Sequence, residues 1–450
     1  MPGLPSRAAL ACLLAVTALA GGIRAYHLTT PGSIVWDEYY YARDACYYSG
    51  RPAAECHRSH DATREHPPLG KRLIEAGIDT FGYTPLGWRI ASWLAGTLTV
   101  ALLFLLALRL FRSVAWATLA AALLAVDPLH FVHSRIAMLD VFATLFIVAA
   151  LLFGLLDRDA GGTAVWRRPW LAAAGVSLGL AAASKWSGWQ LLPALVVLVL
   201  LWAPAGRRRA AAAAAGTWLV VLPAVVYTAS FAGRLDGGPA TWPRAFARLQ
   251  LHMWRFQDSL DGVNPYQSRP WEWLPMRRPV AYYFSEHGGT YREVLAVGSP
   301  PIWWAGAIGV LVAAAVWIRR RSSSGPEPVL VLAAAALYLS WFVLAANRGF
   351  VFITYMVPVV PVLCLGAAYV GAQVWPRLAG RAAVCVVAAA ALAWFAFAYP
   401  VLTARPLSAG EWRDRIVFRH CGQAATVNHE GLLVPRLGRV VLPPEGWCWV

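Results

Sequence analysis

The sequence predicts an all-α polytopic membrane protein with about 11 transmembrane helices. Three observations support this fold class. Of the 450 residues, 59% are hydrophobic and only 14% are charged, a balance that is unusual for a soluble globular protein. Apolar runs of bilayer length recur along the chain, and charged or Pro/Gly-rich segments separate them. Basic residues also concentrate in alternate connections between these runs, as they do in inserted membrane proteins.

The predicted membrane spans cover residues 8–25, 89–110, 115–127, 136–156, 169–184, 188–203, 210–232, 301–318, 329–346, 350–374 and 382–401. The spans that begin near 115, 169 and 188 are short for a bilayer and could be tilted or re-entrant. The first span could instead be a secretory signal peptide, because small residues follow its apolar stretch near Ala20. The segment after it lies outside the membrane under either interpretation.

Charge asymmetry predicts the orientation of these spans. With a cytoplasmic N-terminus, the inner segments carry Arg7, Arg109, Arg112, Arg158, Arg167, Arg168, Arg207, Arg208, Arg209, Arg319, Arg320, Arg321, Arg377 and Arg381. The short outer connections carry only Arg135, Lys185 and Arg348. We therefore expect a multi-pass protein of the cell membrane with an extracytoplasmic C-terminus. Much of the net charge of +16 then faces anionic membrane lipids, and we expect no nucleic-acid partner.

Three long outer segments cover residues 26–87, 233–299 and 403–450. Long loops in compact proteins usually carry function, so we expect a catalytic membrane domain over residues 1–402 whose first two outer segments hold the site. Residues 403–450 are expected to form an extracytoplasmic tail. Cysteines in these outer segments suggest the disulfides Cys46–Cys56 and Cys421–Cys448. No Cys/His spacing typical of a metal site occurs in the sequence.

The first outer segment begins with two adjacent carboxylates among aromatic residues, Asp37 and Glu38. A carboxylate in partly apolar surroundings is more basic and can accept a proton from an attacking hydroxyl group. An acidic pair that offsets a helix dipole is the structural alternative. The segment continues with His66-Pro67-Pro68-Leu69-Gly70-Lys71, where His66 and Lys71 could bind an anion or be solvated residues of a turn.

Arg135, Lys185 and Arg348 are exceptions to the charge asymmetry, and all three are predicted on the outer side. A pocket for the phosphate of a lipid would explain why these cations lie there. Arg135 paired with a carboxylate, and Lys185 extended toward the headgroups, are the structural alternatives. Asp140, one helical turn and a half after Arg135, should face a polar interior because ionisable groups at membrane depth are costly.

The second outer segment contains Asn264-Pro265-Tyr266-Gln267-Ser268-Arg269-Pro270-Trp271. Tyr266 and Trp271 suit stacking against a sugar ring, and Gln267 and Arg269 can donate hydrogen bonds to hydroxyl or phosphate oxygens. An aromatic belt at the membrane interface would explain the aromatic residues equally well.

Together these motifs resemble protein O-mannosyltransferases, which are membrane glycosyltransferases of the GT-C fold. The resemblance follows the family's order up to about residue 400 and rests on Asp37-Glu38, His66 to Lys71, Ser134-Arg135 with Leu139-Asp140, Lys185-Trp186 and Pro265 to Trp271. It implies transfer of mannose from a polyprenyl-phosphate-mannose donor to Ser or Thr hydroxyls of exported proteins, with inversion at the anomeric carbon. It also implies that no metal or other cofactor is needed.

Carried over to this sequence, the resemblance implies that Asp37 is the catalytic base and that Glu38 shapes the site. The residues expected to contact the donor phosphate or lipid are Arg135, Lys185, Gln267, His66, Lys71 and Arg348. The residues expected to contact substrate are Tyr266, Arg269, Trp271 and Asp140. The second outer segment lacks room for the extra domain of eukaryotic members, so the resemblance is to the shorter bacterial ones.

Other functions remain open on the sequence alone. The same fold could transfer sugar to a lipid or glycan, as aminoarabinose and arabinose transferases do. A transporter is less consistent, because the sequence shows no repeated halves and the unusual charges lie at the outer ends of the spans. A scaffold would not require the acidic pair or the outer cations. The expected partners are the polyprenyl-phosphate sugar donor, exported acceptor proteins, the secretion machinery and membrane lipids.

Overall fold

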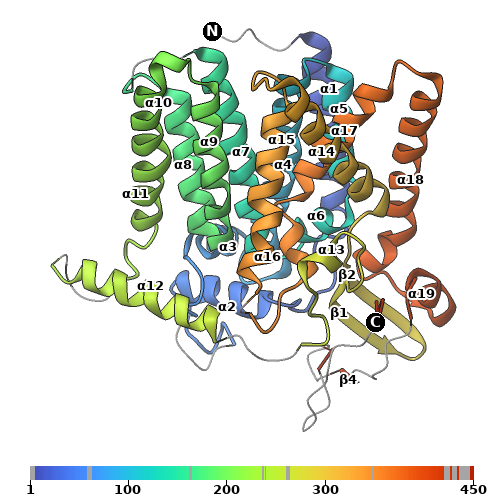
Figure 1. The fold of residues 1–450 in the computed structure, drawn as a ribbon. Helices are drawn as coiled ribbons and strands as arrows, with labels where there is room; N and C mark the ends of the chain where they lie inside the picture. The colour runs from blue at the N-terminus through green and yellow to red at the C-terminus, as the bar shows by residue number, and fades with distance from the viewer. Residues whose placement is uncertain are drawn as a thin grey trace.

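The computed structural model describes residues 6–57, 63–161, 165–235, 238, 240–259, 264–346, 348–419, 426–427, 433–434 and 446–449. Long helices run side by side in a bundle, and shorter elements form a layer at its lower end (Figure 1). Helix α1 (Arg7–Ala25) begins at the upper end, whereas the sheet and helix α19 (Ala409–Arg415) belong to the lower layer. The bundle and the outer layer predicted from the sequence are therefore separate parts of one structure.

Within the described residues, seven helical segments are long and apolar enough to cross a membrane, and four shorter apolar helices accompany them. Every predicted span overlaps one of these segments, so the helical membrane fold is confirmed, while the count of about 11 crossings stays a prediction. The other bundle helices are α4 (Pro85–Phe111), α5 (Val114–Ala125), α7 (Leu139–Ala160), α8 (Pro169–Ser184), α9 (Leu192–Trp202), α10 (Arg208–Ala215), α11 (Leu222–Ala229), α14 (Pro300–Arg320), α15 (Glu327–Ala334), α16 (Ser340–Leu344), α17 (Val360–Val374) and α18 (Leu378–Leu402).

Short 3₁₀ and π segments interrupt or extend this bundle: η1 (Trp186–Leu191), η2 (Ala205–Arg207), η3 (Gly216–Val221), η4 (Ala335–Leu339) and η5 (Ile353–Met356). One of them corrects a predicted boundary. The span expected over residues 350–374 is helical as α17 only from Val360, after the separate turn η5. Pro358 and Pro361 explain this break, because proline lacks a backbone donor and disfavours helical geometry in the residue before it.

Helix α1 belongs to the bundle and packs against α4 and α5. The buried Arg24 side chain near its end donates to the carbonyl oxygens of Ala125 at 3.0 Å and Leu124 at 3.3 Å. These carbonyls lie at the end of α5, where a helix leaves its last acceptors unpaired. The contacts favour a membrane helix over the signal-peptide alternative.

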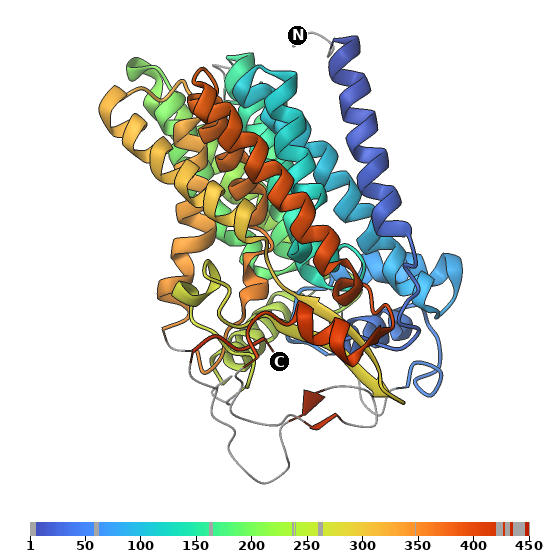
Figure 2. The same ribbon diagram turned by 90° about the vertical axis from the view of Figure 1, so that its right-hand side faces the viewer.

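The lower layer contains helices α2 (Glu38–Tyr48), α3 (Leu69–Phe81), α12 (Trp242–Asp258) and α13 (Pro270–Trp273), and α6 (Pro128–His133) connects α5 to α7. It also holds a three-stranded sheet of β1 (Val280–His287), β2 (Thr290–Ala296) and β3 (Leu407–Ser408), and a separate pair of β4 (Thr426–Val427) and β5 (Leu433–Val434). Figure 2 shows the hairpin of β1 and β2 beneath the bundle, with α19 beside it.

This hairpin is not among the elements that the sequence analysis expected. Gly288 and Gly289 form its two-residue turn, with φ angles of 58° and 75° that glycine adopts without steric cost. Strand β3 then joins β2 through the pairs Thr290 with Ser408 and Tyr291 with Leu407. The first residues after α18 therefore return to the second outer segment.

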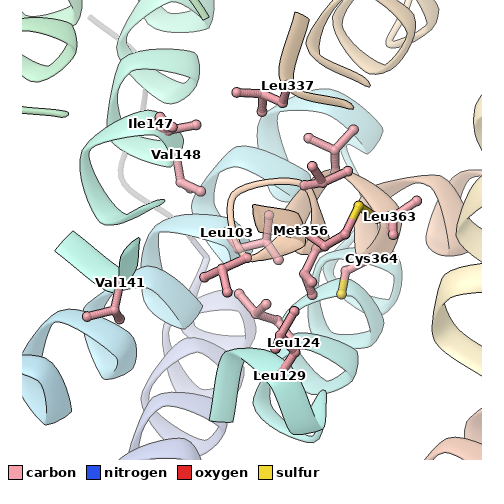
Figure 3. Close-up of a cluster of buried hydrophobic side chains, with 14 of the residues drawn as sticks. Leu103, Leu124, Leu129, Val141, Ile147, Val148, Leu337, Met356, Leu363 and Cys364 are labelled. Atoms are coloured by element: carbon pink, nitrogen blue, oxygen red, sulfur yellow. The ribbon is translucent and has the colours of Figure 1, made fainter. Parts of the chain in front are cut away.

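Apolar side chains from many helices fill the middle of the bundle. Figure 3 shows a part of this core, with Leu103 of α4, Leu124 of α5, Val148 of α7 and Leu363 of α17 among the labelled residues. Helices α14 and α17 pack especially closely, because a Cβ atom on Gly309 would lie 1.9 Å from the carbonyl oxygen of Gly366. Small residues permit this backbone approach, as they do in membrane helix pairs generally.

The predicted disulfide Cys46–Cys56 is confirmed and connects the end of α2 to the loop that follows it. The predicted pair Cys421–Cys448 cannot be followed in the same way, because Cys421 lies outside the described residues. Cys12, Cys364 and Cys385 are unpaired.

Candidate active site

Asp37 immediately precedes α2 and takes the N-cap position, but its side chain makes no capping hydrogen bond. Its Oδ2 atom instead accepts a hydrogen bond from the hydroxyl of Tyr41, one turn further along α2, at 3.3 Å. The preceding residue, Trp36, has a positive φ of 47°, which turns the chain into the helix. The structure therefore turns the Asp37 carboxylate away from the helix end, unlike the dipole-offsetting pair that was the structural alternative.

The protein around Asp37 makes this carboxylate more basic than an exposed one. Removal from bulk water raises the pKa of Asp37 to about 6, the nearby positive charge of Lys185 opposes the rise, and the negative charge of Asp140 adds to it. A carboxyl with a pKa near 6 is largely ionised at neutral pH and holds a proton better than an ordinary aspartate. Both properties suit a general base.

Glu38 has a different environment from its neighbour. Its buried carboxylate forms a two-point ion pair with Arg89 of α4, with both N–O distances at 2.8 Å. It also accepts hydrogen bonds from the backbone N–H groups of Val35 and Ala137, each at 2.9 Å. Arg89 donates further to the carbonyls of Pro31 and Ser33 in the loop before Asp37. Glu38 thus fixes the loop that carries Asp37, and its role is positional.

An ion pair between Lys185 and Asp140 lies close to Asp37. The Lys185 ammonium donates to both Asp140 oxygens at 2.8 Å. Lys185 ends α8 in an extended conformation, and Asp140 is in the first turn of α7, so two helix ends place the pair. The ammonium also lies 5.1 Å from the ring centre of Tyr355. A cation here could meet a phosphate group that replaces or joins Asp140 as its partner.

Aromatic and imidazole groups surround these charges. The His66 ring lies 5.7 Å from Tyr41, and burial together with the charges of Lys185, Lys71 and Arg348 lowers the pKa of His66 well below its usual value. The Tyr282 hydroxyl on β1 forms a 2.8 Å hydrogen bond with Nε2 of His133. His66 is therefore neutral at physiological pH and can give or accept a hydrogen bond without carrying charge.

Trp36 connects this cluster to the second outer segment. Its ring lies 5.3 Å from Tyr282, 6.0 Å from Tyr266 and 6.1 Å from Phe352. Tyr266, one of the predicted substrate residues, is buried in this aromatic wall. The wall gives the Asp37 site an apolar side that could exclude water from a reacting sugar.

Two predicted phosphate ligands do not join the cluster, and their side chains show why. The Arg135 guanidinium donates to the carbonyl oxygens of Arg24, Tyr26 and His27 at 2.6–2.7 Å, and so holds the end of α1. The Lys71 ammonium is buried against Asp44 at 2.7 Å and joins α3 to α2. Both side chains are bonded within the protein, and a direct contact of either cation with the donor phosphate stays a prediction.

The remaining predicted residues lie around the second outer segment. Arg348 donates to Gln257 of α12 and lies near enough to His66 to affect its charge. The Gln267 side chain accepts from the backbone of Asn264, and Arg269 donates to the carbonyls of Ala345 and Arg348.

Trp271 does not point into the cluster of charges. Its side chain is 60% exposed and contacts Phe342 of α16 on the outside of the bundle. This placement fits the alternative of an aromatic belt at the membrane interface better than stacking on a substrate sugar.

Five residues near Asp37 were not singled out from the sequence: Trp36, Tyr41, His133, Tyr282 and Tyr355. Trp36 directly precedes Asp37, Tyr41 follows it by four positions and His133 precedes Arg135 by two, so nearness to a charged residue was a usable signal. Tyr282 and Tyr355 come from the unpredicted hairpin and from the unpredicted turn η5, so no local pattern pointed to them.

The fold is similar to solved membrane glycosyltransferases. A chain of the Saccharomyces cerevisiae protein O-mannosyltransferase Pmt1–Pmt2 complex bound to the sugar donor aligns with a TM-score of 0.77 at 14% identity, covering 92% of both chains. ArnT from Cupriavidus metallidurans bound to undecaprenyl phosphate aligns with a TM-score of 0.59 at 20% identity, covering 86% of this chain and 64% of that one. These matches show that the chain has the GT-C fold of multi-pass membrane glycosyltransferases.

Sequence comparison gives the family. The model "Dolichyl-phosphate-mannose-protein mannosyltransferase" matches residues 14–90 and 85–234, and the model "C-terminal four TMM region of protein-O-mannosyltransferase" matches residues 243–420. The chain therefore belongs to the protein O-mannosyltransferase family. A polyprenol-phosphate-mannose–protein mannosyltransferase of Mycobacterium tuberculosis is 30% identical over 459 residues, covering 86% of this chain and 87% of that protein. The Mycolicibacterium smegmatis counterpart is 29% identical, covering 89% and 90%.

Proposed function

We propose that this protein transfers mannose from a polyprenyl-phosphate-mannose donor to Ser or Thr hydroxyls of exported proteins. The supporting observation is the Asp37 carboxylate, which caps no helix and lies close to the Lys185–Asp140 ion pair. A base beside a cation is the minimum that a displacement at a sugar phosphate requires. The family relatives named above carry the same activity in their names.

The proposed reaction is a single displacement. The acceptor hydroxyl oxygen attacks C1 of mannose while its proton passes to Asp37, and the bond between C1 and the phosphate oxygen breaks. The electron pair of that bond leaves with the polyprenyl phosphate. Lys185 stabilises the negative charge that develops on the phosphate, and the attack from the opposite side inverts C1. Glu38 holds the loop so that Asp37 keeps its position.

We propose that no metal ion is needed, because Lys185 and Arg348 can supply positive charge at the leaving phosphate. The measurement is the transfer rate of the purified protein after treatment with EDTA and in buffer with added Mg²⁺ or Mn²⁺. We expect less than a twofold difference among these conditions. A rate that EDTA abolishes and a divalent ion restores would contradict this part of the proposal.

The transfer itself is tested with purified protein, radiolabelled polyprenyl-phosphate mannose and a Thr-containing peptide. We expect Asp37→Asn to reduce the rate by about 10²–10⁴-fold, the usual contribution of a general base. Asp79→Asn, an exposed carboxylate on α3, is the matched control and should keep the wild-type rate. Label that appears only in lipid or glycan fractions would instead favour the alternative acceptor class.

We also propose that the site end of the molecule is extracytoplasmic and the N-terminus cytoplasmic, in the cell membrane. The arginines at the ends of α4 and α14 support this orientation, since both helices end away from the outer layer (Figure 1). The disulfide Cys46–Cys56 in that layer also suits an oxidising compartment. In intact cells, an impermeant maleimide should label Glu286→Cys on β1 and should not label Ser322→Cys after α14. Acceptors would then be met as they leave the secretion machinery.

A further inference from the structure

A polar cavity lies beside the aromatic wall of the Asp37 site. It has a volume of about 510 Å³, and its lining includes Gln267, Arg269, Glu272, Arg277 and Arg278. A cavity of this size holds several non-hydrogen atoms of a ligand rather than a single water molecule. Its polar side chains come from α13 and from the segments just before and after it, in the outer layer below the bundle (Figure 1).

The cavity carries more positive than negative charge. Three arginines line it, whereas Glu272 is the one carboxylate among its described lining residues. Glu272 is already engaged, since one oxygen pairs with Arg277 at 3.3 Å and the other accepts the Arg269 backbone N–H at 2.7 Å. The Arg269 side chain donates to two backbone carbonyls, which are neutral partners. The cavity therefore has an unbalanced positive charge that an anion would neutralise.

Arg278 is the residue whose bonding is least complete. Its side chain is 94% buried, yet its Nη1 atom has no hydrogen-bond partner among the described residues, and its Nη2 atom is 3.5 Å from the Gly446 carbonyl. The Nε atom of Arg277 is likewise buried without a partner in the described part of the chain. Buried guanidinium donors normally find acceptors, because an unpaired buried donor is costly. Both arginines line the cavity, so an anion bound there would supply acceptors that the described residues do not.

The position of the cavity relates it to the acceptor polypeptide. Tyr266 and Phe352 form the aromatic wall with Trp36, and each is adjacent in sequence to a cavity residue, Gln267 or Val351. Asp37 directly follows Trp36, so the aromatic wall connects the segment that carries the base to the segments that line the cavity. Gly446, from the C-terminal segment, also lines the cavity. A polypeptide with its hydroxyl at Asp37 could place a nearby side chain there.

We propose that this cavity is an acceptor subsite that binds an aspartate or glutamate side chain near the target Ser or Thr. The inference rests on the proposed function, and it specifies which exported segments the enzyme prefers. The carboxylate would accept hydrogen bonds from Arg278 and Arg277, which their planar guanidinium groups can donate in pairs. Acceptor segments without an acidic residue would still reach Asp37 but would bind less tightly.

The test compares pairs of peptides that contain a single Thr and either Asp or Asn at each of three positions on both sides of it. With the wild-type protein, we expect kcat/KM to be about 10-fold higher for Asp than for Asn at one or two positions, from the strength of a charge-assisted hydrogen bond. The Arg278→Gln variant should bring this ratio close to 1. Arg292→Gln, an exposed arginine on β2, is the matched control and should keep the wild-type ratio.

If Arg278→Gln folds poorly, a charge-reversal variant tests the same inference. Arg278→Glu should then prefer Lys over Asn at the same positions. Equal kcat/KM for Asp and Asn peptides with the wild-type protein would overturn the inference. So would an Arg278→Gln effect that appears as a higher KM for the mannose donor with both peptides, because the cavity would then hold the donor phosphate. Failure of the wild-type protein to mannosylate any peptide would overturn the proposed function itself.

Discussion

Asp37 and Glu38 are adjacent in the sequence but serve different purposes, because the chain directs their side chains to different partners. Asp37 has a single hydrogen bond from Tyr41, whereas Glu38 has two from Arg89 and two from backbone N–H groups. Four donors fix the Glu38 carboxylate in place and leave it little acceptor capacity for a substrate hydroxyl. This contrast supports the proposal that Asp37 accepts the proton and that Glu38 positions Asp37.

The pKa of Asp37 predicts how transfer depends on pH. Because that pKa is raised to about 6, the carboxylate is protonated at pH 5 and ionised at pH 7.5. The rate should therefore rise about 10-fold per pH unit below pH 6 and level off above it. Initial rates measured from pH 5 to 8 give the profile. A rate that is constant over this range would contradict the role of Asp37 as the base.

The same shift predicts the stability of Asp37 variants. A carboxyl whose folded-state pKa exceeds its unfolded value loses stability as pH rises between the two, so the ionised Asp37 weakly opposes folding at neutral pH. Asp37→Asn should consequently unfold no earlier than the wild-type protein, and its loss of activity would be catalytic. Thermal unfolding in detergent measures this directly.

In contrast to Asp37→Asn, Arg89→Ala should lower the stability of the protein. It leaves the buried Glu38 carboxylate without its ion-pair partner, and removing one member of a buried pair costs about 3–5 kcal/mol. We expect a lower Tm together with lost activity, because the loop before Asp37 loses its anchor. Arg72→Ala, whose partner Glu75 lies in a partly exposed pair on α3, is the control and should change Tm little. An unchanged Tm for Arg89→Ala would contradict the anchoring role.

At the scale of elements, close helix contacts depend on a few small residues. A Cβ atom on Gly309 of α14 would fall 1.9 Å from the Gly366 carbonyl of α17, so Gly309→Val must separate two central helices. We expect a loss of about 1–3 kcal/mol or more in stability, seen as a lower Tm in detergent. Gly22→Ala on α1, where a Cβ atom would meet nothing within 4 Å, is the matched control and should be tolerated.

The contact between strand β2 and helix α19 predicts how stability depends on pH. Glu293 on β2 is buried and accepts a 2.7 Å hydrogen bond from Trp412 of α19, and burial raises the pKa of Glu293 to about 8. Since this folded-state pKa lies above the usual value of 4.5, stability should fall as pH rises from about 5 to 8 and then level off. Glu293→Gln should remove that slope. The fluorescence of Trp412 during thermal unfolding at several pH values reports the effect.

Helices and site residues differed in how far the sequence could predict them. Long apolar runs dictate membrane helices because the bilayer leaves the backbone few other structures, and each predicted span has its helix. The hairpin of β1 and β2 was missed because its aromatic and polar residues resemble an interfacial loop. Its Gly288-Gly289 pair is nevertheless typical of a hairpin turn and could have predicted one.

Within the site, sequence reasoning found Asp37, Asp140 and Lys185, because charges next to membrane spans are rare and stand out. It could not find that Arg135 and Lys71 face inward. Side-chain direction is set by which carbonyls and carboxylates the fold brings near, and Arg135 meets carbonyls that are 108 to 111 positions away in the sequence. Such tertiary partners leave no trace in a local motif.

At the scale of the whole molecule, the site depends on partners from distant parts of the chain. Glu38 bonds to Arg89 and to the backbone of Ala137, which follow it by 51 and 99 positions. Asp37 then lies near Lys185 of a still later helix, and Tyr282 comes from the second outer segment. The outer layer and the bundle therefore form one structural unit.

The Glu38 anchor also has a consequence for how the protein is made. During synthesis the loop that carries Asp37 is made before Arg89 and Ala137, which follow Glu38 by 51 and 99 positions. Until those residues arrive, the loop before α2 has neither its ion pair nor its backbone donors, and the carboxylate lacks a fixed position. An unfinished chain therefore contains the Asp37 carboxylate without the Arg89 and Ala137 contacts that position its loop. Those contacts form only when the later helices are present.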